Sequence, residues 1–183
     1  MEHNLKPFLF DIMKNIIGDS KPQFIGEIGT HKGSTAAQLI KHLAPQVEQL
    51  TYYGYDLFDG DNPDRETHKK ERNAKAPATL QMATMSLKKL QRNFSNIEYK
   101  LFKGFTNETL TAPIVFDFVY IDGGHSYETV KYDYSMVKDS KIIIFDDYKI
   151  PGVNQNIQEI IDQGLNVEIV RTPNKHTWAV IRN

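Results

Sequence analysis

The sequence contains no cysteine among its 183 residues. This absence excludes disulfide bonds, cysteine-ligated zinc or iron–sulfur clusters, and a cysteine nucleophile. No run of about 18 apolar residues occurs, so nothing in the sequence predicts a membrane span. The N-terminal segment carries charges within its apolar run and lacks a small-residue cleavage site. It is a poor signal peptide, and we expect a cytoplasmic location.

The chain also lacks an excess of charge of either sign. Its 22 basic and 23 acidic side chains give a formal net charge of −1, so we expect no nucleic-acid partner and no membrane partner. Apolar residues make up 40% and charged residues 25%, which is typical of a soluble globular protein. The length suits one domain, and we predict a single domain over residues 1–183.

Apolar runs alternate along the chain with segments of helical periodicity. Strands are predicted at 23–28, 50–58, 97–104, 115–122, 141–147, 167–172 and 177–182, and helices at 3–17 (within an N-terminal segment 1–18), 34–44, from 77 onward, after Ser126 and at 154–163. This alternation indicates an α/β fold, a Rossmann-like, doubly wound parallel sheet with helices on both faces. A hairpin around 173–175 makes the last of the seven strands antiparallel. We expect Ser34 or Thr35 to cap the helix at 34–44.

Residues 59–76 differ from the rest of the chain. They contain five acidic and five basic side chains and almost no apolar residue that could enter a core. A loop of this length is more often functional or disordered than ordinary. The segment is therefore predicted to be a solvated loop or a mobile lid.

The predicted strand ends carry glycine and acidic residues, and ligands of open parallel sheets bind beyond those ends. Gly29 lets the backbone bend sharply and lets a ligand approach the main chain, although a tight turn needs glycine whatever it binds. The turn from Gly29 to Gly33 lacks the phosphate-loop signature and departs from the dinucleotide fingerprint. Asp56, at the end of the second strand, suits hydrogen bonding to ribose hydroxyls.

Three carboxylates follow the fourth and fifth predicted strands: Asp122, Asp146 and Asp147. If these strands are neighbours, the carboxylates converge, and they repel one another unless a cation lies among them. Oxygen ligands favour magnesium, calcium or manganese. The alternative is that each acid caps a helix or faces water. His125, three residues after Asp122, is either a general base or a residue that orients Asp122.

These motifs resemble those of class I S-adenosylmethionine-dependent methyltransferases. The first motif is Phe24-Ile-Gly-Glu-Ile-Gly-Thr-His-Lys-Gly-Ser-Thr35, and Asp56 resembles the family's ribose-binding acid. Tyr120-Ile-Asp-Gly-Gly-His-Ser-Tyr127, followed by Phe145-Asp-Asp147, resembles the branch of macrolide-sugar (macrocin-type) O-methyltransferases. The resemblance covers nearly the whole chain from about residue 23.

The resemblance implies a site for S-adenosylmethionine, a site for Mg²⁺ and methylation of a small hydroxylated acceptor such as a sugar or a catechol-like diol. The cofactor residues it implies are Glu27, Gly29, Thr30, Gly33, Ser34, Asp56, Phe105, Thr106 and Asp122. The metal residues it implies are Asp122, Asp146 and Asp147, and the catalytic residues are His125 and Asp122. The alternatives are metal-independent methylation, a non-catalytic nucleoside-binding module and, least favoured, an NAD-dependent reductase. Whether the chain forms a homo-oligomer stays open.

Overall fold

The structure is a computed structural model that describes residues 7–58, 78–171 and 176–183. The segment 59–76, predicted to be a loop or lid, lies outside the described residues, and so does the predicted turn at 173–175. None of the described helices is long and apolar enough to cross a membrane.

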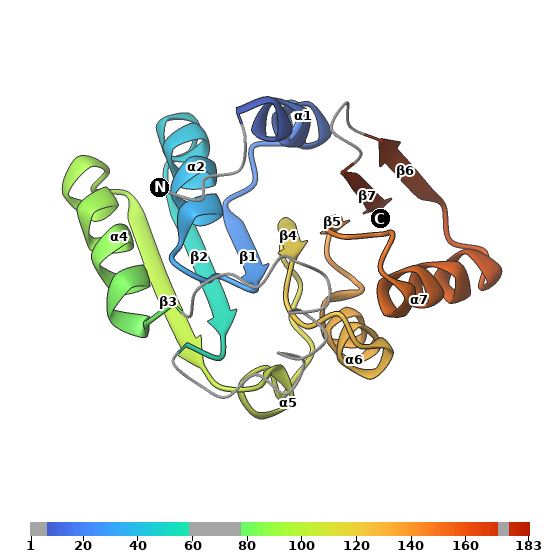
Figure 1. Cartoon of the computed structure of the whole chain (residues 1–183). Helices are drawn as coiled ribbons and strands as arrows, with labels where there is room; N and C mark the ends of the chain where they lie inside the picture. The colour runs from blue at the N-terminus through green and yellow to red at the C-terminus, as the bar shows by residue number, and fades with distance from the viewer. Residues whose placement is uncertain (1–6, 59–77, 172–175) are drawn as a thin grey trace.

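Strands and helices alternate as the sequence predicts (Figure 1). The strands are β1 (Phe24–Ile28), β2 (Leu50–Asp56), β3 (Ile97–Lys103), β4 (Phe118–Ile121), β5 (Ile142–Phe145), β6 (Val167–Arg171) and β7 (Thr177–Arg182). The helices are α1 (Pro7–Ile17), α2 (Ser34–Leu43), the 3-10 turn η1 (Ala44–Gln46), α4 (Leu80–Asn93), α5 (Thr106–Thr109), α6 (Tyr127–Val137) and α7 (Pro151–Asp162). The short α5 and the 3-10 turn η1 are the elements among these that the sequence does not predict.

The seven strands form one sheet in the order β3-β2-β1-β4-β5-β7-β6. β1 to β5 are parallel, and β7 pairs antiparallel with both β5 and β6, so the prediction of an antiparallel last strand is confirmed. The strand order reverses between β1 and β4, which makes their carboxyl ends the switch point of the sheet. In folds of this kind the switch point is where ligands bind.

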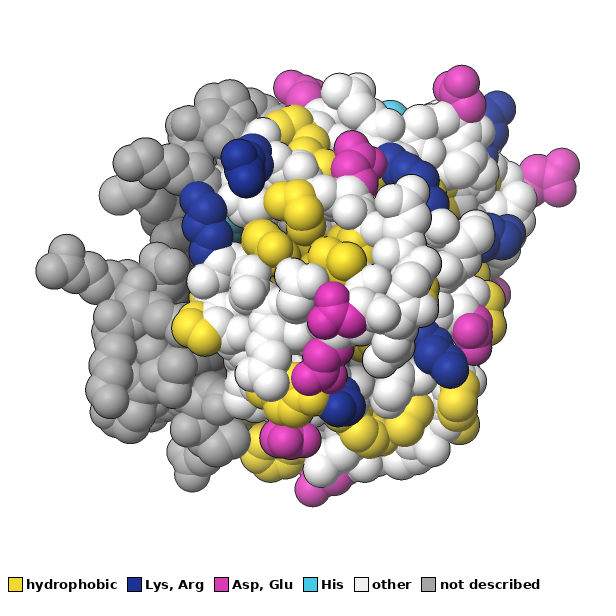
Figure 2. Space-filling view, turned by 90° about the vertical axis from the view of Figure 1, so that its right-hand side faces the viewer, with side chains coloured by type: hydrophobic (Ala, Val, Ile, Leu, Met, Phe, Trp, Pro, Cys, Tyr) yellow, Lys and Arg dark blue, Asp and Glu magenta, His cyan; other side chains and the backbone are white. Residues whose placement is uncertain are grey.

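Two apolar layers hold helices against the two faces of the sheet. On one face, α1, α2 and α4 pack on alternate strand residues such as Ile25, Leu50 and Phe118. On the other face, α6 and α7 pack on Val119, Ile143 and their neighbours. The central strands β4 and β5 are buried at every position because helices cover both of their faces, which explains their unbroken apolar sequences. Figure 2, which views the side of β6 and α7, shows apolar side chains interspersed with acidic and basic ones.

The helix starts agree with the sequence in some places and not in others. Ser126 caps α6, where its hydroxyl oxygen accepts a hydrogen bond from the Thr129 amide. The expected cap by Ser34 or Thr35 is wrong, because Gly33, in a left-handed conformation with φ of 75°, occupies the N-cap of α2 and Ser34 is already helical. α7 begins earlier than predicted because Pro151 suits the first turn of a helix.

Candidate active site at the switch point

A buried polar cluster lies at the end of β1. Glu27 is 1% exposed, and its carboxylate accepts a hydrogen bond of 2.6 Å from the Tyr52 hydroxyl of β2. The Thr30 hydroxyl lies 3.2 Å from the same oxygen of Tyr52. Burial, together with the Glu27 charge, raises the pKa of Tyr52 well above its usual value, so Tyr52 stays protonated and donates. The cluster fixes the Glu27 carboxylate beneath the turn that follows β1.

That turn lies directly against the end of β4. Gly29 has φ of +96°, and a Cβ added to it would stand 2.0 Å from the carbonyl oxygen of Asp122. The amides of Gly29 and Thr30 both donate to the carbonyl of Tyr55, which ties the turn to β2 as well. Only glycine permits this approach of two backbones, so the requirement for Gly29 is steric as well as conformational. The missing Cβ of Gly29 thus makes room for the backbone at the end of β4.

The carboxylate of Asp56 joins the ends of β1 and β2. One of its oxygens accepts a 2.7 Å hydrogen bond from the amide of His31, which has φ of 50°, and the other accepts from the amide of Phe58 at 2.9 Å. Each carboxylate oxygen has two lone pairs, so both retain capacity for a further donor such as a ribose hydroxyl. The structure thus brings Asp56 to the same rim as Gly29.

The remaining predicted cofactor residues lie on the turns around this rim. Gly33 donates its amide to the carbonyl of Thr30 and closes the β1–α2 turn, and Ser34 opens α2. Phe105 precedes α5 and is 42% exposed, while Thr106 is the first residue of that helix. The amide of Gly104, just before them, donates to the carbonyl of Asp56, which places this turn beside the end of β2.

The carboxylate of Asp146 is turned into the protein. It accepts hydrogen bonds from the Tyr120 hydroxyl at 2.5 Å, the Trp178 indole N–H at 3.0 Å and the Asp147 amide at 2.7 Å, and it lies 3.1 Å from Nδ1 of His176. Burial alone would raise the pKa of Asp146, but the partnership with His176 and the bonds from Tyr120 and Asp147 lower it overall. The same partnership raises the pKa of His176. Asp146 is therefore an ionised carboxylate with an internal countercharge.

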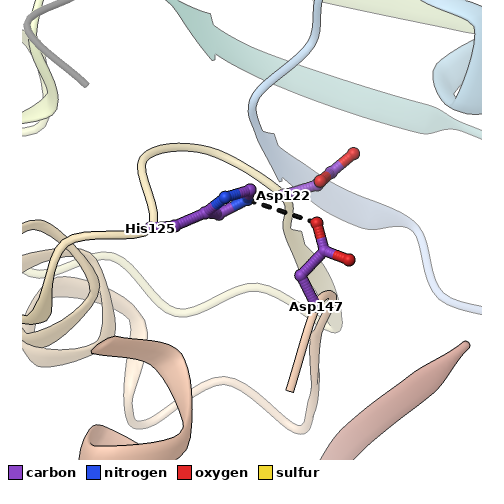
Figure 3. A group of neighbouring side chains, drawn as sticks. All are labelled: Asp122, His125 and Asp147. Atoms are coloured by element: carbon purple, nitrogen blue, oxygen red, sulfur yellow. Dashed lines mark ion pairs between the residues drawn. The ribbon is translucent and has the colours of Figure 1, made fainter. Parts of the chain in front are cut away.

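Asp122, His125 and Asp147 face one another across the ends of β4 and β5 (Figure 3). Nε2 of His125 lies 3.4 Å from a carboxylate oxygen of Asp147. The three residues each offer one ligand atom within 4.8 Å of the others, and so do Asp146, Asp147 and His176. Asp147 has φ of 51°, and this left-handed turn separates its side-chain direction from that of Asp146. The structure thus distributes the three predicted metal carboxylates over two clusters that share Asp147.

Several residues of this site were absent from the sequence prediction. Glu27 pairs in register with Gly54 of β2, and Tyr52 lies two residues before Gly54 on that strand. Tyr120 of β4 pairs with Ile144 of β5, which lies two residues before Asp146. A tyrosine in phase with an acid on a neighbouring strand is a signal that the sequence does carry. Trp178 on β7 and His176, the residue just before β7, reach Asp146, and no local pattern indicates that contact.

Comparison with known proteins supplies the family. Residues 27–148 match the model of a family described as a methyltransferase domain. No curated protein matches the chain.

Solved structures share the fold. The O-methyltransferase NovP has a TM-score of 0.69 at 16% identity, over 96% of this chain and 78% of that chain. Cofactor-bound Rv0187 from MTB has a TM-score of 0.66 at 16% identity, over 100% and 82%. The O-methyltransferase TomG from Streptomyces achromogenes, in complex with SAM, has a TM-score of 0.60 at 13% identity, over 98% and 81%.

A doubly wound sheet with a glycine turn at its switch point, and an acid at the end of the next strand, defines a nucleoside-binding enzyme fold of the class I methyltransferase type. Because the family model covers more than half of the residues, this chain belongs to that methyltransferase family, and it is an S-adenosylmethionine-dependent methyltransferase.

Proposed function

We propose that the protein methylates a hydroxyl oxygen of a small acceptor, such as a sugar or a catechol-like diol, with the aid of a divalent cation. The observation that carries this proposal is the group of Asp122, His125 and Asp147 beside the glycine turn of the switch point. The names of the similar structures, O-methyltransferases among them, support the choice of oxygen as acceptor. A cytoplasmic location and the absence of nucleic-acid and membrane partners stay predictions.

In this proposal the rim of β1 and β2 holds the cofactor. When bound, S-adenosylmethionine supplies an electrophilic methyl group on a sulfonium centre. The turn at Gly29 holds its methionine part, with the buried Glu27 at the end of β1 beside it, and Asp56 accepts hydrogen bonds from the ribose hydroxyls. Phe105 and Thr106 line the adenine end. The protein's task is to hold the acceptor oxygen in line with the methyl carbon and the sulfur.

The acceptor proton must leave as the oxygen attacks. His125 is the proposed base: an imidazole whose ordinary pKa lies near neutrality takes a proton effectively at physiological pH. The oxygen lone pair then forms the bond to carbon while the carbon–sulfur bond breaks, and S-adenosylhomocysteine leaves. Asp122 and Asp147 lie beside His125.

The carboxylates also suit a cation. Asp122 and Asp147 offer oxygen ligands, and His125 offers a third ligand atom. Asp146, the other carboxylate predicted to bind the metal, is already paired with His176 inside the protein. When bound, Mg²⁺ would lower the pKa of the acceptor hydroxyl. A histidine ligand would broaden the choice to Mn²⁺ and other first-row ions. His125 then has two candidate roles, ligand and base.

The cofactor part is tested by thermal unfolding with added ligand. S-adenosylhomocysteine should raise the melting temperature and NAD should not, because a ligand stabilises only the state that binds it. Asp56→Ala should reduce the shift. Asp162→Ala, an exposed acid on α7, is the matched control and should keep it. Stabilisation by NAD alone would contradict the proposal.

The metal part is tested by turnover on a panel of diols with excess chelator, then with Mg²⁺ or Mn²⁺ restored. Loss and recovery are expected. His125→Ala should lower turnover by about 10²–10⁴ if His125 is the base, with cofactor affinity unchanged. Full activity in chelator would favour the second candidate, metal-independent methylation. The internal partners of Asp146, which leave that carboxylate without need of a cation, are the observation on its side.

A further inference from the structure

Asp133 is a buried acid in the middle of α6 that the proposed chemistry does not use. It lies on the same helix face as Val130 and Val137, which pack against the sheet, and it is 0% exposed. Among the residues that the structure describes, no donor meets hydrogen-bond geometry to either of its carboxylate oxygens. A fully buried polar group without a partner is costly, so this position calls for a specific reason.

Asp133 lies against two turns of the proposed cofactor site, the turn at Gly123 after β4 and the turn at Thr106 after β3. Its Oδ2 is 3.7 Å from the place where a Cβ on Gly123 would stand, and Gly123 directly follows Asp122. Thr106, the first residue of α5, is its other polar neighbour. One side chain in the interior thus touches both the turn after β3 and the turn after β4.

We infer that Asp133 is a positioning residue for the cofactor: from inside the protein, its carboxyl group holds the Thr106 turn and the Gly123 turn in the arrangement that closes on the adenine end. The inference rests on the proposed cofactor site. Asp133 acts through these turns, because its full burial keeps it out of contact with ligand. The Thr106 side chain already interacts with this carboxyl group, and the turn at Gly123 lies against it, so both turns are held from the inside.

The neutral form of Asp133 is the form that burial between these turns favours. A protonated carboxyl group both donates and accepts, whereas a carboxylate only accepts. Burial raises the pKa of Asp133 to about 7, and the Thr106 side chain only partly offsets that effect. Titratable side chains also lie on the elements around it: Asp122 and His125 on the turn, Glu108 on α5, Tyr127, Glu128, Lys131, Tyr132 and Tyr134 on α6, and Glu159 and Asp162 on α7. Lys131 and Glu159 pair with each other. None of these titratable side chains is a cause of the shift.

The protonation of Asp133 should make cofactor affinity depend on pH. If the closed arrangement requires neutral Asp133, cofactor affinity is full below pH 7 and falls as the group ionises above it. With a pKa of about 7, the neutral fraction drops about tenfold between pH 6 and pH 8, and the apparent dissociation constant should rise by about tenfold.

The test is calorimetric titration of S-adenosylhomocysteine into the full-length protein at pH 6 and pH 8. Wild type should lose about tenfold in affinity at the higher pH. Asp133→Asn, which is neutral at every pH and keeps a donor and an acceptor, should bind equally well at both. Asp133→Leu should bind weakly at both, and Asp139→Asn, an exposed acid just beyond α6, should behave as wild type.

The outcomes separate the inference from its premise. An Asp133→Asn protein with the same tenfold loss as wild type would overturn the inference, and so would an Asp133→Leu protein that binds as tightly as wild type. If Asp133→Leu fails to fold, the comparison of wild type with Asp133→Asn across pH still decides. A wild type that binds no S-adenosylhomocysteine at either pH would refute the proposed cofactor site instead.

Discussion

Replacing Asp146 with Asn should destabilise the fold, even though the substitution keeps the side-chain volume. The carboxylate of Asp146 receives hydrogen bonds from Tyr120, Trp178 and the Asp147 amide, and it is paired with His176. An amide offers one oxygen in place of two and directs an NH₂ group toward the remaining donors. The charge that holds His176 disappears as well. The site therefore loses several charge-assisted contacts and gains a donor that faces donors.

The size of the effect follows from those contacts. Hydrogen bonds to a charged group contribute about 1.5–3 kcal/mol each to net stability. The amide oxygen keeps some of these bonds, and the Tyr120 hydroxyl can rotate to accept from the amide. We therefore expect a loss of about 3 kcal/mol, at the lower end of the range for breaking a buried ion pair. With a urea m-value of about 2 kcal/mol per molar, the unfolding midpoint falls by about 1.5 M.

The loss should depend on pH in a direction set by both partners. The pKa of Asp146 is lowered, so its contribution is present above its ordinary value and is lost as pH falls through the lower folded value. The pKa of His176 is raised, so its contribution is full below 6.5 and is lost as pH rises through the higher folded value. The difference between wild type and Asp146→Asn should therefore be larger at pH 6 than at pH 9.

Urea unfolding monitored by tryptophan fluorescence and circular dichroism measures both quantities. Asp147→Asn is the matched control, because its carboxylate is partly exposed and should cost little stability. An Asp146→Asn protein as stable as wild type at pH 6 would refute the reasoning, since it would mean that the four partners contribute nothing. A difference that grows toward pH 9 would refute the assignment of His176 as the countercharge.

Two further substitutions probe the backbone of the site. Gly29→Ala should abolish cofactor binding and lower stability by several kcal/mol, because its Cβ would meet the Asp122 carbonyl oxygen at 2.0 Å. The control is Gly164→Ala, where φ is +90° and no atom lies within 4 Å of the new Cβ, so thermal unfolding should show only the left-handed backbone strain of roughly 1 kcal/mol. Gly152→Ala, 2.3 Å from the His125 carbonyl, should displace the turn that carries His125 and lower turnover more than it weakens S-adenosylhomocysteine binding. Equal stability of the first pair, or normal turnover in the last variant, would contradict these expectations.

The fold was largely predictable because its signals are local. The alternation of apolar runs and helical periodicity places all seven strands, and the unbroken apolar sequences of β4 and β5 indicate that both strands are buried. The ends of the helices were less predictable than their existence. The left-handed Gly33 took the cap position expected for Ser34 or Thr35, since the steric demand of the turn outweighs side-chain capping. The four-residue α5 has too few residues for a periodic signal.

The site was predictable only in part. Strand ends are visible in sequence, so Gly29, Asp56 and Asp122 could be placed on one rim. The sequence also predicts that the neighbouring acids repel one another, so that, with Asp146 as a metal ligand, its replacement by Asn should leave stability nearly unchanged or improved. The geometry leads to the opposite expectation, because the partners of Asp146 on β4 and β7 come from distant parts of the chain. Asp133 was missed for a different reason: the sequence does not distinguish an acid on the buried face of a helix from one on its exposed face.

The position of β7 has a consequence for synthesis of the protein on the ribosome. β7 lies inside the sheet, between β5 and β6, although it follows both of them in the chain. Until residues 177–182 emerge, the nascent protein presents one edge of the Ile-Ile-Ile-Phe strand β5 without its partner, and an apolar strand edge of this kind invites pairing with other chains. Trp178 and His176 arrive on the same stretch, so Asp146 receives half of its partners only then. A chain whose translation stops before this strand therefore lacks two partners of Asp146 and exposes an unpaired apolar strand edge that chaperones can bind.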